Sequence, residues 1–186
     1  MKGVVFTEFV DWAESVHGLT MVDAMLARAS RQRDGAYAAT GAYDWREFAD
    51  LVTALADLSG TAAPQLLRGY GRHLFGVLAG KFPAFAAGIE SSLTMLERIE
   101  SFIHPEVRKL YPDAELPTFY SERTGNQLRL VYSSPRPFRD FALGLIDGCV
   151  KRFNPGANVQ WTGTENACEF VITVPEGAAC PTTSIR

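Results

Sequence analysis

A segment near the middle of the chain, LRLVYSSPR at residues 128–136, brings together side chains that could bind an anion. It reads as a strand, and alternate strand residues share a face, so the apolar row would continue into Tyr132, Ser134 and Arg136. The arginine fork suits carboxylates or phosphates, and the hydroxyls add donors. Unpaired buried polar groups cost about 1–3 kcal/mol, so these side chains need partners. A bound anion would satisfy them, and so would a protein carboxylate together with backbone groups.

His104 is the second candidate for chemistry among the three histidines. It follows an apolar stripe at helical spacing within residues 93–103 and precedes Pro105, which should disturb the helix there. Its imidazole could bind a metal ion or be a satisfied core group. We assign no function to His17, at the end of a predicted helix, and we interpret His73 as structural.

Other potential sites are weaker. Glu97 and Glu100 share one predicted helix, and we interpret them as part of a solvated face. The segment GYGRHLFG at residues 69–76 contains three glycines, but it lies inside a helical pattern rather than after a strand. Close helix packing explains these glycines better than a nucleotide site. The sequence lacks the GxSxG, phosphate-loop and HExxH motifs.

Composition narrows the class of protein. The 186 residues are 47% hydrophobic, which argues against extensive disorder, and the net charge of −3 argues against a nucleic-acid binder. The N-terminal segment lacks the apolar run of a signal peptide, and no stretch could span a bilayer, so we expect a cytoplasmic protein. The cysteines, which lack CxxC spacing, should be free thiols: Cys149, Cys168 and Cys180.

The order of the predicted elements indicates an α+β fold. Helical patterns fill the first two-thirds of the chain, and Asp44 with Glu47 forms a helix-start signature. Pro137 should open a further amphipathic helix. The predicted strands cover residues 116–123, 127–134, 157–163 and 168–174. Helices followed by strands suggest a helical lobe and a small antiparallel sheet.

Three blocks together resemble the heme nitric-oxide/oxygen-binding family, H-NOX: MKGVVFTEFVDWAESVHG, HPEVRKLYPDAELPTF and YSSPRPFRDFALGLIDG. This family includes the sensor domain of soluble guanylate cyclase and stand-alone bacterial gas sensors. The resemblance spans Met1 to about Val174. It implies one heme-binding domain over residues 1–174, with a helical lobe at about 1–60, a heme-bearing subdomain with the sheet at about 61–174, and the heme between them. Residues 175–186 would form a flexible tail.

The resemblance also implies the cofactor and its ligands. In similar proteins the tyrosine-x-serine-x-arginine motif, here Tyr132, Ser134 and Arg136, binds the two propionates of heme b. His104 matches the proximal iron ligand of the family. Pro117 matches the proline that presses on the porphyrin and distorts it.

Residues on the distal side would decide which gas is retained. Oxygen-binding members of the family carry a tyrosine at the position of Phe141, which has no hydrogen-bond donor. The other distal positions that the resemblance suggests are also apolar: Val5, Phe9, Leu74, Leu78 and Leu145. A pocket without donors favours nitric oxide and carbon monoxide over oxygen. The hydroxyl of Tyr70, one helical turn before Leu74, could reach this pocket, and we expect it to pack elsewhere.

The resemblance bears on zinc as well. Some bacterial members of the family bind a structural zinc ion through cysteines. Here Arg139 and Phe141 stand at two of those positions, and Cys168 alone matches, so we predict no zinc.

These inferences predict a sensor rather than an enzyme. Ferrous heme on His104 would bind nitric oxide or carbon monoxide, the histidine–iron bond would weaken, and the heme would relax from its distortion. A separate effector, such as a histidine kinase or a cyclic-di-GMP enzyme, would read the change. One alternative is a heme-free α+β adaptor that acts through protein contacts. A heme enzyme is disfavoured because the predicted pocket has no titratable group for acid–base catalysis.

Overall fold

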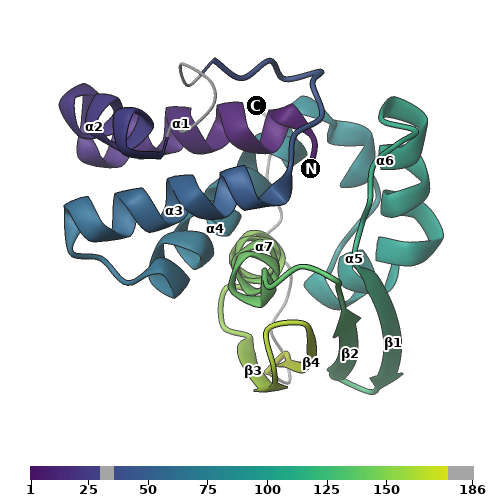
Figure 1. Ribbon diagram of the computed structural model, residues 1–186. Coiled ribbons are helices and arrows are strands. Elements are labelled where there is room, and N and C mark those ends of the chain that lie inside the picture. Colours follow the sequence, from purple (N-terminus) through teal and green to yellow (C-terminus); the bar gives the residue numbers. More distant parts are fainter. Residues whose placement is uncertain (30–35, 176–186) are drawn as a thin grey trace, which may run out of the picture. The chain divides into compact units, whose positions relative to one another are not determined.

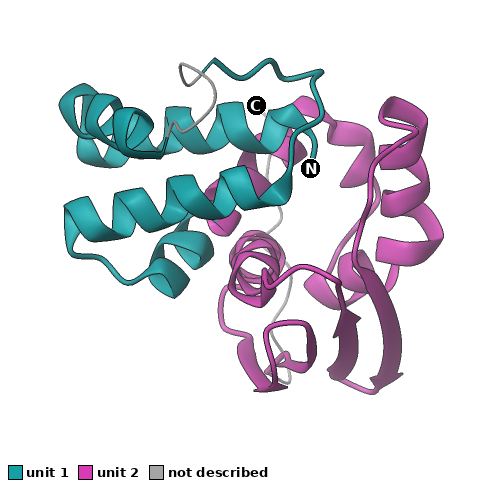
Figure 2. Ribbon diagram, viewed as in Figure 1, with its two compact units in different colours: residues 1–70 teal, residues 71–186 magenta. Residues whose placement is uncertain are grey.

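The computed structural model describes residues 1–29 and 36–175 (Figure 1). The chain divides into two compact units, Met1–Tyr70 and Gly71–Arg186 (Figure 2). Most of the predicted flexible tail at 175–186 lies outside the described residues, as does Cys180. Within the described ranges, no helix has both the length and the apolar character needed to cross a membrane.

The first unit is helical. It contains α1 (Gly3–His17), α2 (Leu19–Ala29), α3 (Trp45–Ser59) and the first part of α4 (Ala63–Lys81). The predicted start signature of α3 is confirmed, because the Asp44 side chain accepts a hydrogen bond from the backbone N–H of Arg46 at 2.9 Å. Gly60 ends α3 in the left-handed region, with φ of 69°.

Aromatic side chains form the core of the first unit. The rings of Phe48 and Tyr70 each lie 5.1 Å from the ring of Phe9, centroid to centroid, in edge-on contacts. Tyr70 is fully buried, and its hydroxyl donates a hydrogen bond to the carbonyl oxygen of Val5 at 2.7 Å. The hydroxyl of Tyr70 therefore has a partner within its own unit.

The second unit combines helices with an antiparallel sheet. Its helical elements after α4 are η1 (Pro83–Phe85), α5 (Ser92–Glu97), the π-helical turn η2 (Ile99–Ile103), α6 (His104–Leu110) and α7 (Arg139–Phe153). Its strands are β1 (Thr118–Thr124), β2 (Gln127–Ser133), β3 (Asn158–Gly163) and β4 (Ala167–Thr173), in the order β1-β2-β4-β3. The predicted α+β fold and the four predicted strands are confirmed.

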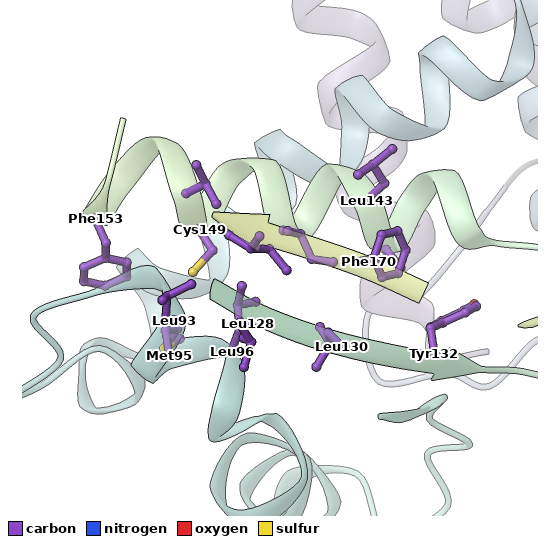
Figure 3. Close-up of a cluster of buried hydrophobic side chains, with 14 of the residues drawn as sticks. Leu93, Met95, Leu96, Leu128, Leu130, Tyr132, Leu143, Cys149, Phe153 and Phe170 are labelled. Carbon is purple, nitrogen blue, oxygen red and sulfur yellow. The ribbon is translucent and has the colours of Figure 1, made fainter. Parts of the chain in front are cut away.

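One face of this sheet packs against helices. Leu128, Leu130 and Tyr132 alternate with exposed or partly exposed residues along β2 and point into the core of the unit, where Phe170 of β4 joins them (Figure 3). Side chains of α5 and α7, among them Leu93, Leu96, Leu143 and Cys149, complete the cluster. The inward row of β2 thus fixes the orientation of the strand that leads into the predicted anion-binding motif.

The strand does not continue through the whole motif. β2 ends at Ser133, which pairs with Ala167, so the prediction of a single strand face reaching Arg136 is wrong. Pro135 has no N–H group and cannot extend the ladder. Ser134 is instead held by Asn166, which accepts the Ser134 N–H at 2.8 Å and donates its side-chain amide to the Ser134 carbonyl at 3.0 Å.

The glycines of α4 include one that allows close helix packing. A Cβ added at Gly71 would lie 2.4 Å from the carbonyl oxygen of Phe141 and 2.9 Å from the backbone nitrogen of Leu145, both on α7. A Cβ at Gly76 would meet nothing within 4 Å. The interpretation of this glycine-rich segment as a helix-packing feature is confirmed at Gly71.

Candidate functional site

His104 begins α6 directly after a π-helical turn. In this turn the backbone N–H of His104 donates to the carbonyl of Ile99, and the N–H of Ile103 donates to the carbonyl of Arg98 at 3.0 Å, so each bond spans five residues. Pro105 lies at the start of α6, where a missing N–H is tolerated. Because the π-helical turn interrupts the α-helix directly before His104 and Pro105, the predicted disturbance of the helix is confirmed. Such π-helical turns are frequent at functional sites.

The imidazole of His104 is buried and hydrogen-bonded. His104 is 8% exposed, and its Nδ1 lies 3.0 Å from Oε1 of Glu100. Burial lowers the pKa of His104, and the neighbouring Glu100 carboxylate only partly offsets this effect. The ring is thus held in the neutral form near neutral pH, which is the form that binds metals. Because Nδ1 is engaged by the carboxylate, Nε2 is the nitrogen suited to a metal.

Glu100 does not belong to a solvated face, so the earlier interpretation of this residue is wrong. Its Oε1 also accepts the backbone N–H of Phe119 at 2.9 Å, which links the helix to the start of β1. Glu97 forms a separate ion pair with Arg123 at 3.0 Å. The spacing of four residues between Glu100 and His104 was the available signal, because such residues are neighbours on a helix.

Phe119 lies between His104 and the motif tyrosine. Its ring centroid is 5.9 Å from that of His104 and 5.4 Å from that of Tyr132. Sequence reasoning singled out Pro117, two residues earlier and partly exposed, but not Phe119. The contacts of Phe119 bring the histidine and the motif into one neighbourhood of the second unit.

The two motif hydroxyls lie in different surroundings, one buried and one in the loop. Tyr132 is 2% exposed, and the side chain of Ser134 lies close enough to act on the pKa of its phenol. Burial raises the pKa of Tyr132, so the phenol keeps its proton and remains a donor. The Ser134 hydroxyl also accepts the backbone N–H of Arg136 at 3.1 Å, which closes the loop into a compact turn.

Arg136 pairs with a protein carboxylate. Its guanidinium donates to the backbone carbonyl of Glu115 at 3.2 Å and forms an ion pair with the Glu115 side chain. The Arg136 side chain is 11% exposed, whereas that of Glu115 is 78% exposed. Of the two partners that the sequence left open, the structure thus contains the protein carboxylate. Because Glu115 is so exposed, a ligand carboxylate could replace it at little cost.

These residues fit a heme group. A buried neutral imidazole with Nδ1 already engaged is a suitable axial ligand. A buried guanidinium and two hydroxyls match the propionates of the cofactor. His104, Tyr132, Ser134 and Arg136 all belong to the second unit, although their contacts with heme remain predictions.

The predicted distal positions fall in both units. Leu74 and Leu78 lie on α4 and Phe141 and Leu145 on α7, and the close approach at Gly71 brings these two helices together. The remaining predicted distal residues, Val5 and Phe9, belong to α1 of the first unit.

The positions considered for zinc have other contacts. The Arg139 guanidinium lies 3.8 Å from the ring centroid of Trp161 and forms an ion pair with Asp140 at 2.8 Å. Cys168 is 5% exposed, and burial raises the pKa of its thiol to about 11. Within the described part of the chain, no three His, Cys, Asp or Glu side chains form a metal-binding group. The absence of zinc stays a prediction.

A cavity elsewhere in the second unit does not coincide with this site. It has a volume of about 260 Å³, and its lining includes Glu90, Arg123 and Asn154. None of its lining residues is a predicted heme contact. We therefore base the functional assignment on His104 and on the loop that bears Ser134 and Arg136, not on this cavity.

Comparison with known proteins identifies the family. The family model described as Haem-NO-binding matches residues 2–161. The chain belongs to the H-NOX family. H-NOX domains are heme-based gas sensors, so the family and the donor set of this site agree.

Solved H-NOX structures resemble this chain over nearly its full length. The unliganded Fe(II) protein from K. algicida is 36% identical, with a TM-score of 0.89, and the match covers 95% of this chain and 98% of that one. The IWP-051-bound Fe(II)CO protein from Shewanella woodyi is 37% identical, with a TM-score of 0.79 and 98% of each chain covered. The Fe(II)NO protein from S. oneidensis, at 24% identity and a TM-score of 0.82, shares the fold over 94% of this chain and 99% of that one. No curated protein matches the chain significantly.

Proposed function

We propose that this H-NOX protein is a sensor that binds ferrous heme b through His104 and responds to nitric oxide and carbon monoxide but not to oxygen. The observation that carries the proposal is the buried imidazole of His104, whose Nδ1 is held by Glu100 at 3.0 Å. This contact orients Nε2 as the metal ligand. Heme held in this way would supply an iron atom to which a diatomic gas can bind.

The polar motif would bind the propionates. Arg136 would exchange the exposed carboxylate of Glu115 for a propionate, keeping a charge-assisted hydrogen bond throughout. The hydroxyls of Tyr132 and Ser134 would donate to the same acidic edge. The largely buried charge of Arg136 is already present in the structure, and it would stay paired after the exchange.

The distal side chains would decide between gases. Bound oxygen carries partial negative charge and gains from a hydrogen-bond donor, whereas nitric oxide needs little such help. The residues proposed for this side have no donor on their side chains: Val5, Phe9, Leu74, Leu78, Phe141 and Leu145. Tyr70 could supply such a donor, but its hydroxyl donates to the Val5 carbonyl at 2.7 Å, which supports the proposal that it does not do so.

The output would arise from His104. His104 would hold the iron, and a gas that weakened this bond would free the imidazole to shift. Pro117 would press on the porphyrin and would lose that hold when the imidazole moved. The shift would change a surface that a separate partner reads, such as a histidine kinase or a cyclic-di-GMP enzyme. The chain itself would then act as a switch rather than as an enzyme.

Absorption spectra of the reduced protein under argon, air and nitric oxide test this proposal. We expect a five-coordinate ferrous spectrum that air leaves unchanged and nitric oxide alters. His104→Ala should abolish the native ferrous spectrum, while His73→Ala on α4 should keep it. Native iron–histidine coordination in His104→Ala would overturn the ligand assignment. A stable oxygen complex in the wild-type protein would overturn the proposed selectivity.

One observation favours the heme-free adaptor as a second candidate. The Arg136–Glu115 ion pair satisfies the motif without any cofactor, as an adaptor would require. Protein that stays colourless after heme addition, with a retained fold by circular dichroism, would favour this adaptor over the sensor.

A further inference from the structure

Glu100 joins two parts of the candidate site through a single oxygen atom. Its Oε1 lies 3.0 Å from Nδ1 of His104 and accepts the backbone N–H of Phe119 at 2.9 Å. The first contact lies within one helical turn, whereas the second reaches 19 residues along the chain to β1. A carboxylate fixed at two points cannot rotate freely, so its position relative to the imidazole is well defined.

This arrangement controls the state of the histidine. An ionised carboxylate can only accept hydrogen bonds, so the Nδ1 atom of His104 must carry the proton. The lone pair of the neutral ring is then on Nε2. A carboxylate acceptor also makes the imidazole a stronger electron donor than an amide or water acceptor does.

We propose that Glu100 is a positioning residue that strengthens the bond between His104 and heme iron and so sets how readily nitric oxide breaks it. This inference rests on the proposed function, because it presupposes that His104 binds the iron. Glu100 acts through His104 and need not touch the cofactor. Its bond to Phe119 anchors the carboxylate to the sheet, so Glu100 resists displacement of the imidazole as well as tuning its basicity.

Two variants separate charge from hydrogen bonding. Glu100→Gln keeps an oxygen that can accept from both His104 and Phe119 but removes the charge. Glu100→Ala removes the acceptor altogether. Glu97→Gln is the matched control, because Glu97 lies on the preceding helical turn and pairs with Arg123 at 3.0 Å rather than with the histidine. Thermal unfolding followed by circular dichroism verifies that all three variants are folded.

The decisive readout is the iron–histidine stretching frequency of the ferrous, gas-free protein, measured by resonance Raman spectroscopy. We expect it to fall in Glu100→Gln, to fall further in Glu100→Ala and to stay unchanged in Glu97→Gln. After mixing with nitric oxide, the histidine–iron bond should be lost about tenfold faster in Glu100→Ala than in the wild type, the lower end of the range usual for such outer partners of metal ligands.

The outcomes distinguish this inference from the function on which it rests. An iron–histidine band present in the wild type and unshifted in both Glu100 variants would overturn the role of Glu100 and leave the sensor proposal standing. A wild-type protein with heme bound but no iron–histidine band would overturn both. A frequency shift of equal size in Glu97→Gln would also overturn the role of Glu100, because the shift would then come from the loss of any nearby negative charge.

Discussion

The guanidinium of Arg136 and the carboxylate of Glu115 form an ion pair between a largely buried cation and an exposed anion. A second bond from Arg136 to the Glu115 backbone carbonyl, at 3.2 Å, ties the motif loop to the segment that leads into Pro117. The side chain of Glu115 therefore stands where a propionate would compete for the same donor. The backbone contact does not depend on the identity of that side chain.

Glu115→Gln should increase heme affinity. It removes the competing anion while leaving the backbone contact to Arg136 intact. Because the Glu115 carboxylate is exposed, we assign the pair no more than about 1 kcal/mol and expect heme to bind up to about fivefold more tightly. Titration of heme-free protein with hemin measures this. Glu122→Gln on β1 is the control, since Glu122 pairs with Arg129 at 3.5 Å instead. Weaker binding in Glu115→Gln would contradict the competition.

Arg136→Lys should release heme faster although it preserves the charge. Lysine lacks the planar fork that binds a carboxylate through two hydrogen bonds. Loss of one charge-assisted hydrogen bond is worth about 1.5–3 kcal/mol, so dissociation should accelerate about 10- to 100-fold. Transfer of heme to excess apomyoglobin gives the rate. Arg129→Lys, on the exposed face of β2, should leave the rate unchanged, and equal rates in both variants would argue against a propionate on Arg136.

The sequence predicted the elements well because their signals are local. Apolar periodicity, the cap at Asp44 and the turn residues define helices and strands without knowledge of tertiary contacts. The environment of the site was less predictable. The position of the Glu100 carboxylate depends on its bond to the backbone N–H of Phe119, 19 residues later. The position of the Arg136 guanidinium depends on its bond to the carbonyl of Glu115, 21 residues earlier. Such pairings form only after the fold brings distant segments together.

The end of β2 illustrates the same limit. Alternation along the strand correctly predicted that Leu128, Leu130 and Tyr132 face the core. It could not show that pairing with β4 stops opposite Ser133 or that Ser134 is held by Asn166. The residue types of the motif indicated anion chemistry, but the loop geometry came from a partner 32 residues away.

Phe141→Tyr should make the reduced, heme-loaded protein bind oxygen stably. The substitution adds a hydroxyl donor on α7, at a position that we propose for the distal side of the heme. The reduced variant should acquire a new spectrum in air, while the wild type should not. Tyr70→Phe is the companion variant, and it should not alter the response to oxygen because its hydroxyl bonds the Val5 carbonyl. An oxygen complex in the wild type that disappears in Tyr70→Phe would show that the donor is Tyr70.

Gly71→Ala should destabilise the protein. The new Cβ would lie 2.4 Å from the Phe141 carbonyl, and such overpacking costs about 1–3 kcal/mol. Gly76→Ala in the same helix meets nothing within 4 Å and should gain about 0.5–1 kcal/mol from helix propensity. Urea unfolding midpoints should therefore shift in opposite directions. A stabilised Gly71→Ala would contradict the close packing of α4 on α7.

The Cys168 thiol should react slowly at neutral pH. Burial raises its pKa to about 11, so little thiolate is present until the pH approaches that value. The rate of alkylation by iodoacetamide should rise about tenfold per pH unit between pH 7 and 10, because the thiolate fraction does so below the pKa. Mass spectrometry of the Cys168 peptide follows this thiol separately from the others. Rapid modification at pH 7 would contradict the burial of the thiol.

The paired bonds between Ser134 and Asn166 have a consequence for the order of events during protein synthesis. The loop bearing Ser134 and Arg136 is anchored by a residue that leaves the ribosome 32 positions later. His104 and the whole motif are therefore translated before the anchor that holds the loop exists. The motif can reach its final geometry only once the turn between β3 and β4 has emerged and paired. A nascent chain shorter than this would present the histidine without a completed loop, so under the proposed function we expect stable capture of heme only in the last stage of folding.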